Sequence, residues 1–280
     1  MKEEHILRVK RLLGTKAVAW RPLIVKASIG KAISPLDETG IKSALLPNYS
    51  DVPSAEWSIV DIGSFDRSKT EHWLVAIDRI NGETASINKA IENGKLERVA
   101  VFALAAQPLL MWLGRQLGDK TLVRVFEPMR TNDPEAKWAW EPETGENIDY
   151  KCERLLEGEG LEVILLIALS DNLGHDKYHG MVSGDPHVYQ MTIDNPVQGF
   201  LRKKSDQAGF VSTTRALLNR IQRDVGKDCL IHVLPAMPAS LAVEFGRLIQ
   251  PTKDPSIFVY EYFPRQGPKK VVELLNQSDR

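Results

Sequence analysis

The segment VAVFALAAQPLLMWLGRQL (residues 99–117) carries the clearest fold signal in the sequence. It opens with six consecutive apolar residues, passes through the small turn Ala105-Ala106-Gln107, and then Pro108 starts an apolar segment that runs to Leu117. Proline is well tolerated at the start of a helix, where its missing N–H would have no partner. The pattern predicts a buried strand, a tight turn and a helix.

A second strand is predicted directly after this helix. Gly118 and Asp119 end the helix, and residues 122–126 form a new apolar run. A strand, a helix and a strand in this order form a unit with parallel strands, and strands that are apolar along their whole length are buried on both faces. We therefore expect an α/β protein with mainly parallel central sheets flanked by helices.

The same order of elements returns about 132 residues later, at residues 230–261. An apolar run (230–234) is followed by the turn PAMPAS, a helical segment (241–249) and another strand (257–261). Apolar positions agree through most of the two segments, although identity alone would be no more than chance. Aligned without gaps, they share Val101 with Val233, Leu109 with Leu241, Gly114 with Gly246, and Arg115 with Arg247.

The elements before each unit also correspond. Residues 57–64 match residues 163–170 as first strands, and residues 72–78 match residues 187–194 as second strands. A helix follows in each copy, at 83–93 and at 207–225. The offset between the copies grows along the chain, as longer loops in the second copy would require. We predict a duplicated fold; the alternative is that any two such units look alike at this level.

The duplication divides the chain. The polar stretch at residues 141–146 contains proline and glycine and marks a boundary. We predict a first subdomain at residues 51–145 and a second at residues 146–280. Residues 1–50 stay unassigned; residues 1–31 hold eight basic against two acidic side chains, which is typical of either a solvated surface or an interaction arm.

The overall composition excludes several classes of protein. Among 280 residues, 36 are basic and 37 acidic, so the net charge of −1 excludes the basic surface of proteins that coat duplex nucleic acid. The two cysteines have no paired spacing, which indicates a reducing compartment and no thiolate zinc site. No signal peptide or membrane-spanning run is evident, and we expect a cytoplasmic protein.

Motifs for common enzyme chemistry are missing. The sequence has no P-loop, no GxGxxG, no GxSxG and no HExxH motif. His175, Asp176 and His179 could ligate a metal or serve a phosphodiesterase, but the glycines around them favour a polar loop and we predict no metal. A nucleotide-processing enzyme remains the alternative function, and a pure interaction protein is a third possibility.

The turns after the strands are the best candidates for a binding site. Ligands of parallel sheets collect at the carboxyl ends of strands, where helix N-termini present free N–H groups suited to phosphates. The alternative is that the small residues in these turns only allow close packing. With the stacking and charged residues nearby, the predicted ligand-binding set is Gln107, Pro108, Arg130, Trp140, Ser170, Asp171, Lys203, Met237, Pro238, Ala239 and Tyr262.

Three groups of residues stand out: Trp138-Ala139-Trp140, the segment HVLPAMP (232–238), and Leu241-Ala242 with Gly246-Arg247. Together they resemble the SAVED domain (SMODS-associated and fused to various effectors). The resemblance covers about residues 57–265. It implies two fused CARF-like Rossmann subdomains and a sensor of cyclic oligonucleotides in CBASS or type III CRISPR antiphage defence. Such a sensor holds a cyclic di- or trinucleotide, adenine-containing, between its halves and needs no cofactor.

The resemblance carries particular residues into that pocket: Gln107, Ser170, Met237, Pro238 and Ala239, with Arg130, Trp140, Lys203 and Tyr262 as further members. SAVED domains are normally fused to an effector, and the first 50 residues are too few for one. We therefore expect an effector on another chain, a fragment of a longer protein, or a partner that meets the N-terminal segment. Ligand-induced homo-oligomerisation is expected, and contact with membranes is not.

Overall fold

The computed structural model describes residues 20–29, 38–45, 57–119, 122–133 and 135–276. The first half of the chain forms β1 (Arg21–Ile29), α2 (Glu38–Leu45), β2 (Ser58–Phe65), α3 (Thr70–Glu92), β3 (Arg98–Leu104), α4 (Gln107–Leu117) and β4 (Leu122–Phe126). The second half forms β5 (Lys151–Leu156), β6 (Glu162–Ala168), α5 (His175–Tyr178), β7 (His187–Thr192), α6 (Lys204–Val225), β8 (Leu230–Ala236), α7 (Ala239–Leu248), β9 (Ser256–Phe263) and β10 (Gly267–Leu275).

Two sheets carry the same strand order. Sheet A is parallel throughout, in the order β2-β1-β3-β4. Sheet B has the order β10-β9-β8-β6-β7-β5, and its inner strands read β7-β6-β8-β9, which are parallel and repeat the order of sheet A. The outer strands β5 and β10 pair antiparallel to their neighbours. The prediction of a duplicated α/β fold is confirmed.

The predicted alignment of the first two strands of each copy was wrong. Residues 72–78 were expected to be a strand, yet they lie in α3, where Trp73, Ala76 and Ile80 are buried at helical spacing. Leu74 and Val75 are exposed on the outer face of that helix, and they gave the run its strand-like composition. The counterpart of β7 is therefore β2 rather than residues 72–78.

The counterpart of β6 is β1, which lies in the segment left unassigned by the sequence. It pairs with both β2 and β3, so it is an inner strand of sheet A. Most of the basic side chains counted in residues 1–31 fall in 1–19 and 30–37, outside the described residues. The subdomain boundary at residues 145 and 146 stays a prediction.

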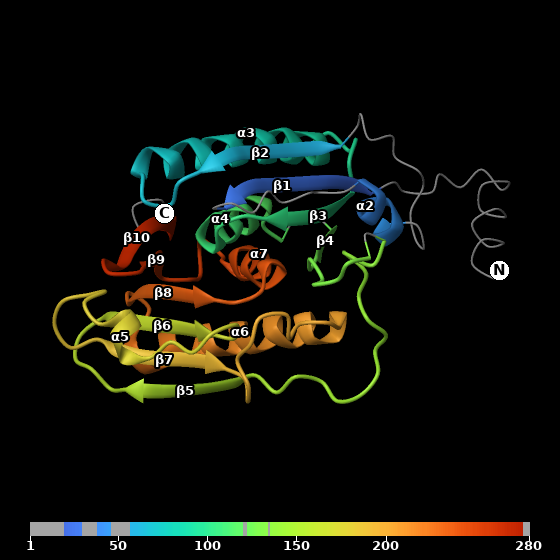
Figure 1. Ribbon diagram of the computed structural model, residues 1–280. Helices are drawn as coiled ribbons and strands as arrows, with labels where there is room; N and C mark the ends of the chain where they lie inside the picture. The colour runs from blue at the N-terminus through green and yellow to red at the C-terminus, as the bar shows by residue number, and fades with distance from the viewer. Residues whose placement is uncertain (1–19, 30–37, 46–56, 120–121, 134, 277–280) are drawn as a thin grey trace, which may run out of the picture.

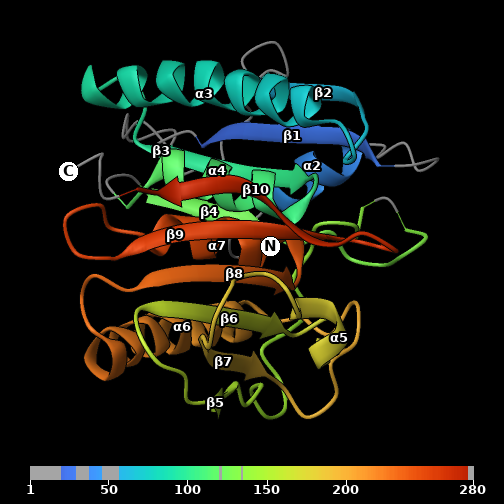
Figure 2. The ribbon, with the colours of Figure 1, turned by 90° about the vertical axis from the view of Figure 1, so that its left-hand side faces the viewer.

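Both sheets are covered on both faces, as their apolar strands require. In β3, Val99 and Val101 face the helices α3 and α4, whereas Ala100 and Phe102 face α2 and Trp138. In sheet B, α6 and α7 cover one face and the segment around α5 covers the other. Figure 2 shows α3 and α6 at opposite ends of the molecule, as an approximate two-fold relation between the halves demands.

The halves meet where α4 crosses α7, near the centre of the molecule (Figure 1). A Cβ atom added to Gly114 would lie 1.9 Å from the carbonyl oxygen of Val243. One added to Gly246 would lie 1.8 Å from the carbonyl oxygen of Met111. Each glycine thus faces the backbone of the other helix, and the apolar core continues through this crossing from one sheet to the other.

We expect Gly246→Ala to destabilise the protein by about 1–3 kcal/mol or more, because the new methyl group meets backbone that cannot rotate away. Gly82→Ala is the matched control: Gly82 also lies in a helix, α3, but a Cβ there meets no atom within 4 Å. Helix propensity should make that variant more stable by up to about 1 kcal/mol. Urea unfolding measures both changes, and similar stabilities for the two variants would contradict the tight crossing.

Candidate functional site

The turns that follow β3 and β8 lie against each other. The Gln107 side-chain oxygen accepts a hydrogen bond of 3.1 Å from the backbone N–H of Met237, which joins the first half to the second. Pro108 is buried in the first turn of α4. Pro238 precedes α7, and Ala239 is its first residue. The five predicted residues in these turns therefore occupy one place at the carboxyl ends of the central strands.

Glu127 makes a second connection between the halves. It follows β4, and its carboxylate accepts a hydrogen bond of 2.8 Å from the backbone N–H of Ser240, in the first turn of α7. Burial raises the pKa of Glu127 to about 7, although the N–H and hydroxyl groups of Ser240 and the N–H of Ala239 act in the opposite direction. A carboxyl group close to its titration point at neutral pH thus joins the two halves.

This connection has no equivalent in the other direction. Glu261 is the counterpart of Glu127. Val125 pairs with Val101 of β3, and Val259 pairs with the equivalent Val233 of β8. Each glutamate follows its valine by two residues. The position that corresponds to Ser240 is Pro108, which has no N–H to donate. Glu261 instead forms an ion pair of 2.5 Å with Arg67; burial raises its pKa, and Arg67 opposes that rise.

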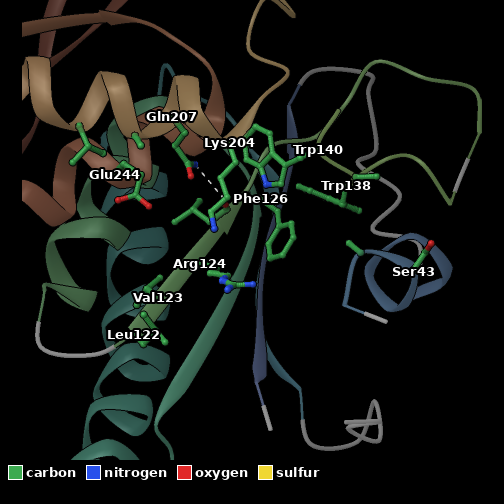
Figure 3. Close-up of a pocket in the computed structure, with 15 residues that line it drawn as sticks. Ser43, Leu122, Val123, Arg124, Phe126, Trp138, Trp140, Lys204, Gln207 and Glu244 are labelled. Atoms are coloured by element: carbon green, nitrogen blue, oxygen red, sulfur yellow. Dashed lines mark hydrogen bonds between the residues drawn. The ribbon is translucent and has the colours of Figure 1, made fainter. Parts of the chain in front are cut away.

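A cavity of about 790 Å³ lies beside β4, and residues of both halves form its walls (Figure 3). The first half contributes α2, β4 and the loop at residues 138–140; the second contributes the start of α6 and the middle of α7. The lining residues are Ser43, Ala44, Leu122, Val123, Arg124, Val125, Phe126, Trp138, Ala139, Trp140, Lys204, Gln207, Ala208, Val211 and Glu244.

The position of the cavity follows from a difference between the sheets. In sheet B, β10 pairs with the outer edge of β9 and also contacts α4. In sheet A, β4 is the outermost strand of the described residues, and the cavity lies between its edge and α7. Approximate symmetry would create two equivalent grooves. One is filled by β10, and the other is the cavity.

The cavity walls combine aromatic rings with cations. Phe126, Trp138 and Trp140 supply rings, and Arg124 and Lys204 supply positive charge (Figure 3). Bases stack on aromatic side chains at about 1–3 kcal/mol each, and phosphates are attracted to the cations. This combination suits a nucleotide.

Two further polar groups mark the walls. The Gln207 side-chain amide donates to the carbonyl oxygen of Val125 at 3.2 Å, so it occupies a backbone acceptor on the edge of β4. The indole N–H of Trp138 is buried, and no hydrogen-bond partner for it lies within the described part of the chain. Buried donors without partners are rare, and a ligand acceptor in the cavity would explain this one.

The cavity adjoins the turns described above. Phe126 lines the cavity, and Glu127 is the next residue along the chain. On the opposite wall, Glu244 lies one helical turn after Ser240. Of the predicted ligand-binding residues, Trp140 lines the cavity itself, and the five turn residues are not among its lining residues.

The remaining predicted residues have partners elsewhere. Arg130 hydrogen-bonds the side chain of Gln198. The Lys203 ammonium donates to the carbonyl oxygen of Glu146 at 2.6 Å, which anchors the start of α6. Asp171 pairs with Lys177 at 2.6 Å, and the Ser170 N–H donates to the Ala236 carbonyl oxygen. Tyr262 packs with the apolar cluster on the α5 side of sheet B. Their role as ligand contacts stays a prediction.

The predicted set omitted Arg124, Lys204 and Gln207, which the structure places in the cavity walls. A signal for part of this wall is present in the sequence. Lys204, Gln207, Ala208 and Val211 are spaced as i, i+3, i+4 and i+7, so they share one face of a helix. No comparable pattern identifies Arg124, which lies within an apolar strand.

The histidines singled out as possible metal ligands lie away from the cavity. His175 and His179 are exposed, with ring centroids 5.1 Å apart, and α5 lies on the opposite face of sheet B from α6. Within the described ranges, no group of three or more His, Cys, Asp or Glu residues could hold a metal ion. None of the helices described there is long and apolar enough to cross a membrane.

Solved structures share this architecture of two CARF-like halves. A receptor from Acinetobacter baumannii, the Cap4 SAVED/CARF-domain containing receptor with the cyclic trinucleotide 2'3'3'-cAAA, is 14% identical with a TM-score of 0.57 over 97% of this chain and 55% of that chain. The same receptor with 3'3'3'-cAAA is 12% identical with a TM-score of 0.56 over 96% and 54%. The Moraxella osloensis Cap4 receptor is 14% identical with a TM-score of 0.56 over 97% and 54%.

This chain therefore spans about half the length of those receptors, and the likeness establishes the fold. The family is established by sequence: the model of the SMODS-associated and fused to various effectors sensor domain matches residues 80–271. The chain belongs to the SAVED family. No curated protein sequence matches it.

We expect Glu127→Gln to reduce the pH dependence of stability. The folded protein binds the Glu127 proton more tightly than the unfolded chain does, because the pKa rises from 4.5 to about 7 on folding. The free energy of unfolding of the wild type should therefore fall as the pH rises from about 4.5 to 7. Glu244 and Glu261, whose pKa values burial also raises, contribute to the same fall.

The glutamine variant should show a shallower fall over that range: the share of Glu244 and Glu261 stays, and His232, whose pKa burial lowers, acts in the opposite direction in both proteins. Urea unfolding at pH 5, 6, 7 and 8 measures it for both proteins. Identical slopes would show that Glu127 is not held in a buried carboxyl site.

Proposed function

We propose that this protein is a sensor that binds a cyclic oligonucleotide second messenger between its two halves and passes the signal on by oligomerisation or by activating an effector. The observation that carries the proposal is the open groove beside β4 in a duplicated fold: it has walls from both halves, aromatic rings and two cations. Membership of a family of sensor domains supports it. Antiphage defence of the CBASS or type III CRISPR kind is the corresponding biological role.

The ligand that fits best is a small ring of nucleotides. The cavity of about 790 Å³ falls within the usual range of roughly 300–1,000 Å³ for small-molecule sites. Similar receptors have been solved with the cyclic trinucleotide cAAA. We propose an adenine-containing cyclic di- or trinucleotide, with one base stacked on Trp140 and phosphates near Arg124 and Lys204.

Signal transmission would follow from the position of the site between the halves. A ligand that contacts both halves, through the cavity and through the turns at Gln107 and Met237, prefers the arrangement in which both contacts are made. That preference favours one assembly state over others. We propose a ligand-induced homo-oligomer in the cytoplasm that controls an effector outside residues 1–280.

We propose binding without cleavage of the ligand. The groups that a phosphodiesterase would use, His175 and His179, lie on the side of sheet B that faces away from the cavity. Cleavage on this scaffold remains the alternative to be tested directly.

Variants of the cavity walls test the proposal. Trp140→Leu should weaken binding of 3'3'3'-cAAA by roughly 5- to 150-fold, because a stacked base is worth about 1–3 kcal/mol and leucine keeps only the apolar contact. Lys204→Ala should weaken it as well, with a smaller loss at high salt. Lys151→Ala is the control and should bind like the wild type, because it removes only a surface lysine of β5 that pairs with Asp194.

Isothermal titration gives the affinities, and thermal melting confirms that each variant folds. A panel of cyclic di-, tri- and tetranucleotides that neither binds nor raises the melting temperature of the wild type would refute the proposed function.

Incubation of the wild type with radiolabelled ring for several hours distinguishes a receptor from an enzyme. We expect only the intact ring on separation of the products, and a larger particle by light scattering when ligand is present. Linear product that disappears in His179→Ala would instead support the phosphodiesterase.

A further inference from the structure

The N-terminus of α7 has the properties of an anion site, and Glu127 occupies it. The helix begins at Ala239 and has ten residues, so its first turn carries a partial positive charge. Two backbone N–H groups there, those of Ala239 and Ser240, donate to the Glu127 carboxylate. Ser240 is 1% exposed; its hydroxyl lies at the Glu127 carboxylate, whose pKa it helps to lower, but it makes no hydrogen bond of good geometry among residues that the structure describes. The helix start thus has a buried polar group whose hydrogen-bonding capacity is not fully used.

This site borders the cavity. Phe126 and Glu244 line the cavity, and both are labelled in Figure 3. Phe126 directly precedes Glu127 in the chain, and Glu244 lies one helical turn after Ser240. The charged groups on the packed elements are Arg124 on β4, Lys204 on α6, and the pair of Glu244 with Arg247 on α7 at 2.8 Å. Glu244 is paired with Arg247, and Arg124 and Lys204 are the cations among the cavity's lining residues.

We propose that Glu127 and a phosphate group of the bound oligonucleotide compete for the N-terminus of α7, so that binding requires Glu127 to take up a proton or to leave. This inference rests on the proposed function and specifies how the ligand meets the second half. Without ligand, the carboxylate joins β4 to α7. With ligand, the phosphate accepts the same N–H groups, and the nucleotide ring replaces the carboxylate as the connection between the halves.

Proton uptake can be assigned to the protein. Phosphodiesters keep their negative charge throughout the neutral range, so a change of affinity between pH 6 and pH 8 does not come from the ligand backbone. Burial places the pKa of Glu127 at about 7, in the middle of that interval. Full competition with the ionised form would weaken binding about ten-fold between pH 6 and pH 8.

The duplication supplies a matched control. Glu261 occupies the equivalent place in the second half, but it pairs with Arg67, and the helix position equivalent to Ser240 is Pro108, which has no N–H. Glu261→Gln removes the same charge from the same kind of position without opening an anion site.

The experiment is titration of 3'3'3'-cAAA into wild type, Glu127→Gln and Glu261→Gln at pH 6 and pH 8, in two buffers of different ionisation enthalpy. We expect the wild type and Glu261→Gln to bind about ten-fold more tightly at pH 6, with net proton uptake at pH 7. Glu127→Gln should bind equally at both pH values, without proton uptake, and more tightly than the wild type at pH 8.

Two results would overturn the inference and leave the sensor function intact: equal affinity of the wild type at both pH values, or the full pH dependence retained in Glu127→Gln. If cAAA and the other rings of the panel fail to bind any of the three proteins, the proposed function fails and this inference fails with it.

Discussion

Gly114 and Gly246 each contact the backbone of the opposite helix, and this close approach sets how the two halves of the protein fit together. At this distance no side chain larger than hydrogen fits at either position. The crossing brings α4 and α7 together, and their first turns carry Gln107 and Ser240, the residues that connect the halves at the strand ends. The close approach of two helices therefore fixes where the ends of two sheets meet.

The departures from symmetry then define the site. A duplicated fold offers two equivalent grooves, and β10 fills one of them. It also offers two equivalent carboxylates, Glu127 and Glu261. Only Glu127 finds a backbone N–H at the equivalent helix position, because Pro108 stands where the other half has Ser240. What remains is one cavity beside β4 and one carboxylate, Glu127, on the start of α7. A ring of nucleotides has different contacts to make on its two sides, and an asymmetric site between similar halves can provide them.

The repeat was predictable from the sequence where the backbones of the two copies touch, because such contacts restrict the residue type at each position. Three of the four residues shared by the two copies, at positions 109, 114 and 115 and their counterparts, lie on the crossing helices. Elsewhere any apolar residue of suitable size preserves the core, so identity disappears while the pattern remains. The alignment failed at β1, because Lys26 and its basic neighbours mark that segment as surface. In the structure Lys26 pairs with Asp61 at 2.9 Å and the strand lies inside the sheet.

The site was less predictable, because neighbouring residues of the same type have different partners. Lys203 and Lys204 are adjacent, yet the ammonium of Lys203 bonds the backbone at Glu146 whereas Lys204 lines the cavity. Composition cannot separate them; the direction of each side chain at the start of α6 does. Trp140 was predicted because an aromatic ring next to a strand end is useful to any nucleotide ligand, wherever the ring points.

Hydrogen–deuterium exchange with and without 3'3'3'-cAAA would show whether the ligand binds between the two halves. We expect ligand to slow exchange in both halves at once, in β4 and in the first turns of α6 and α7, while β5 and α5 exchange as before. Protection confined to one half, or centred on the α5 face of sheet B, would contradict a ligand site between the halves.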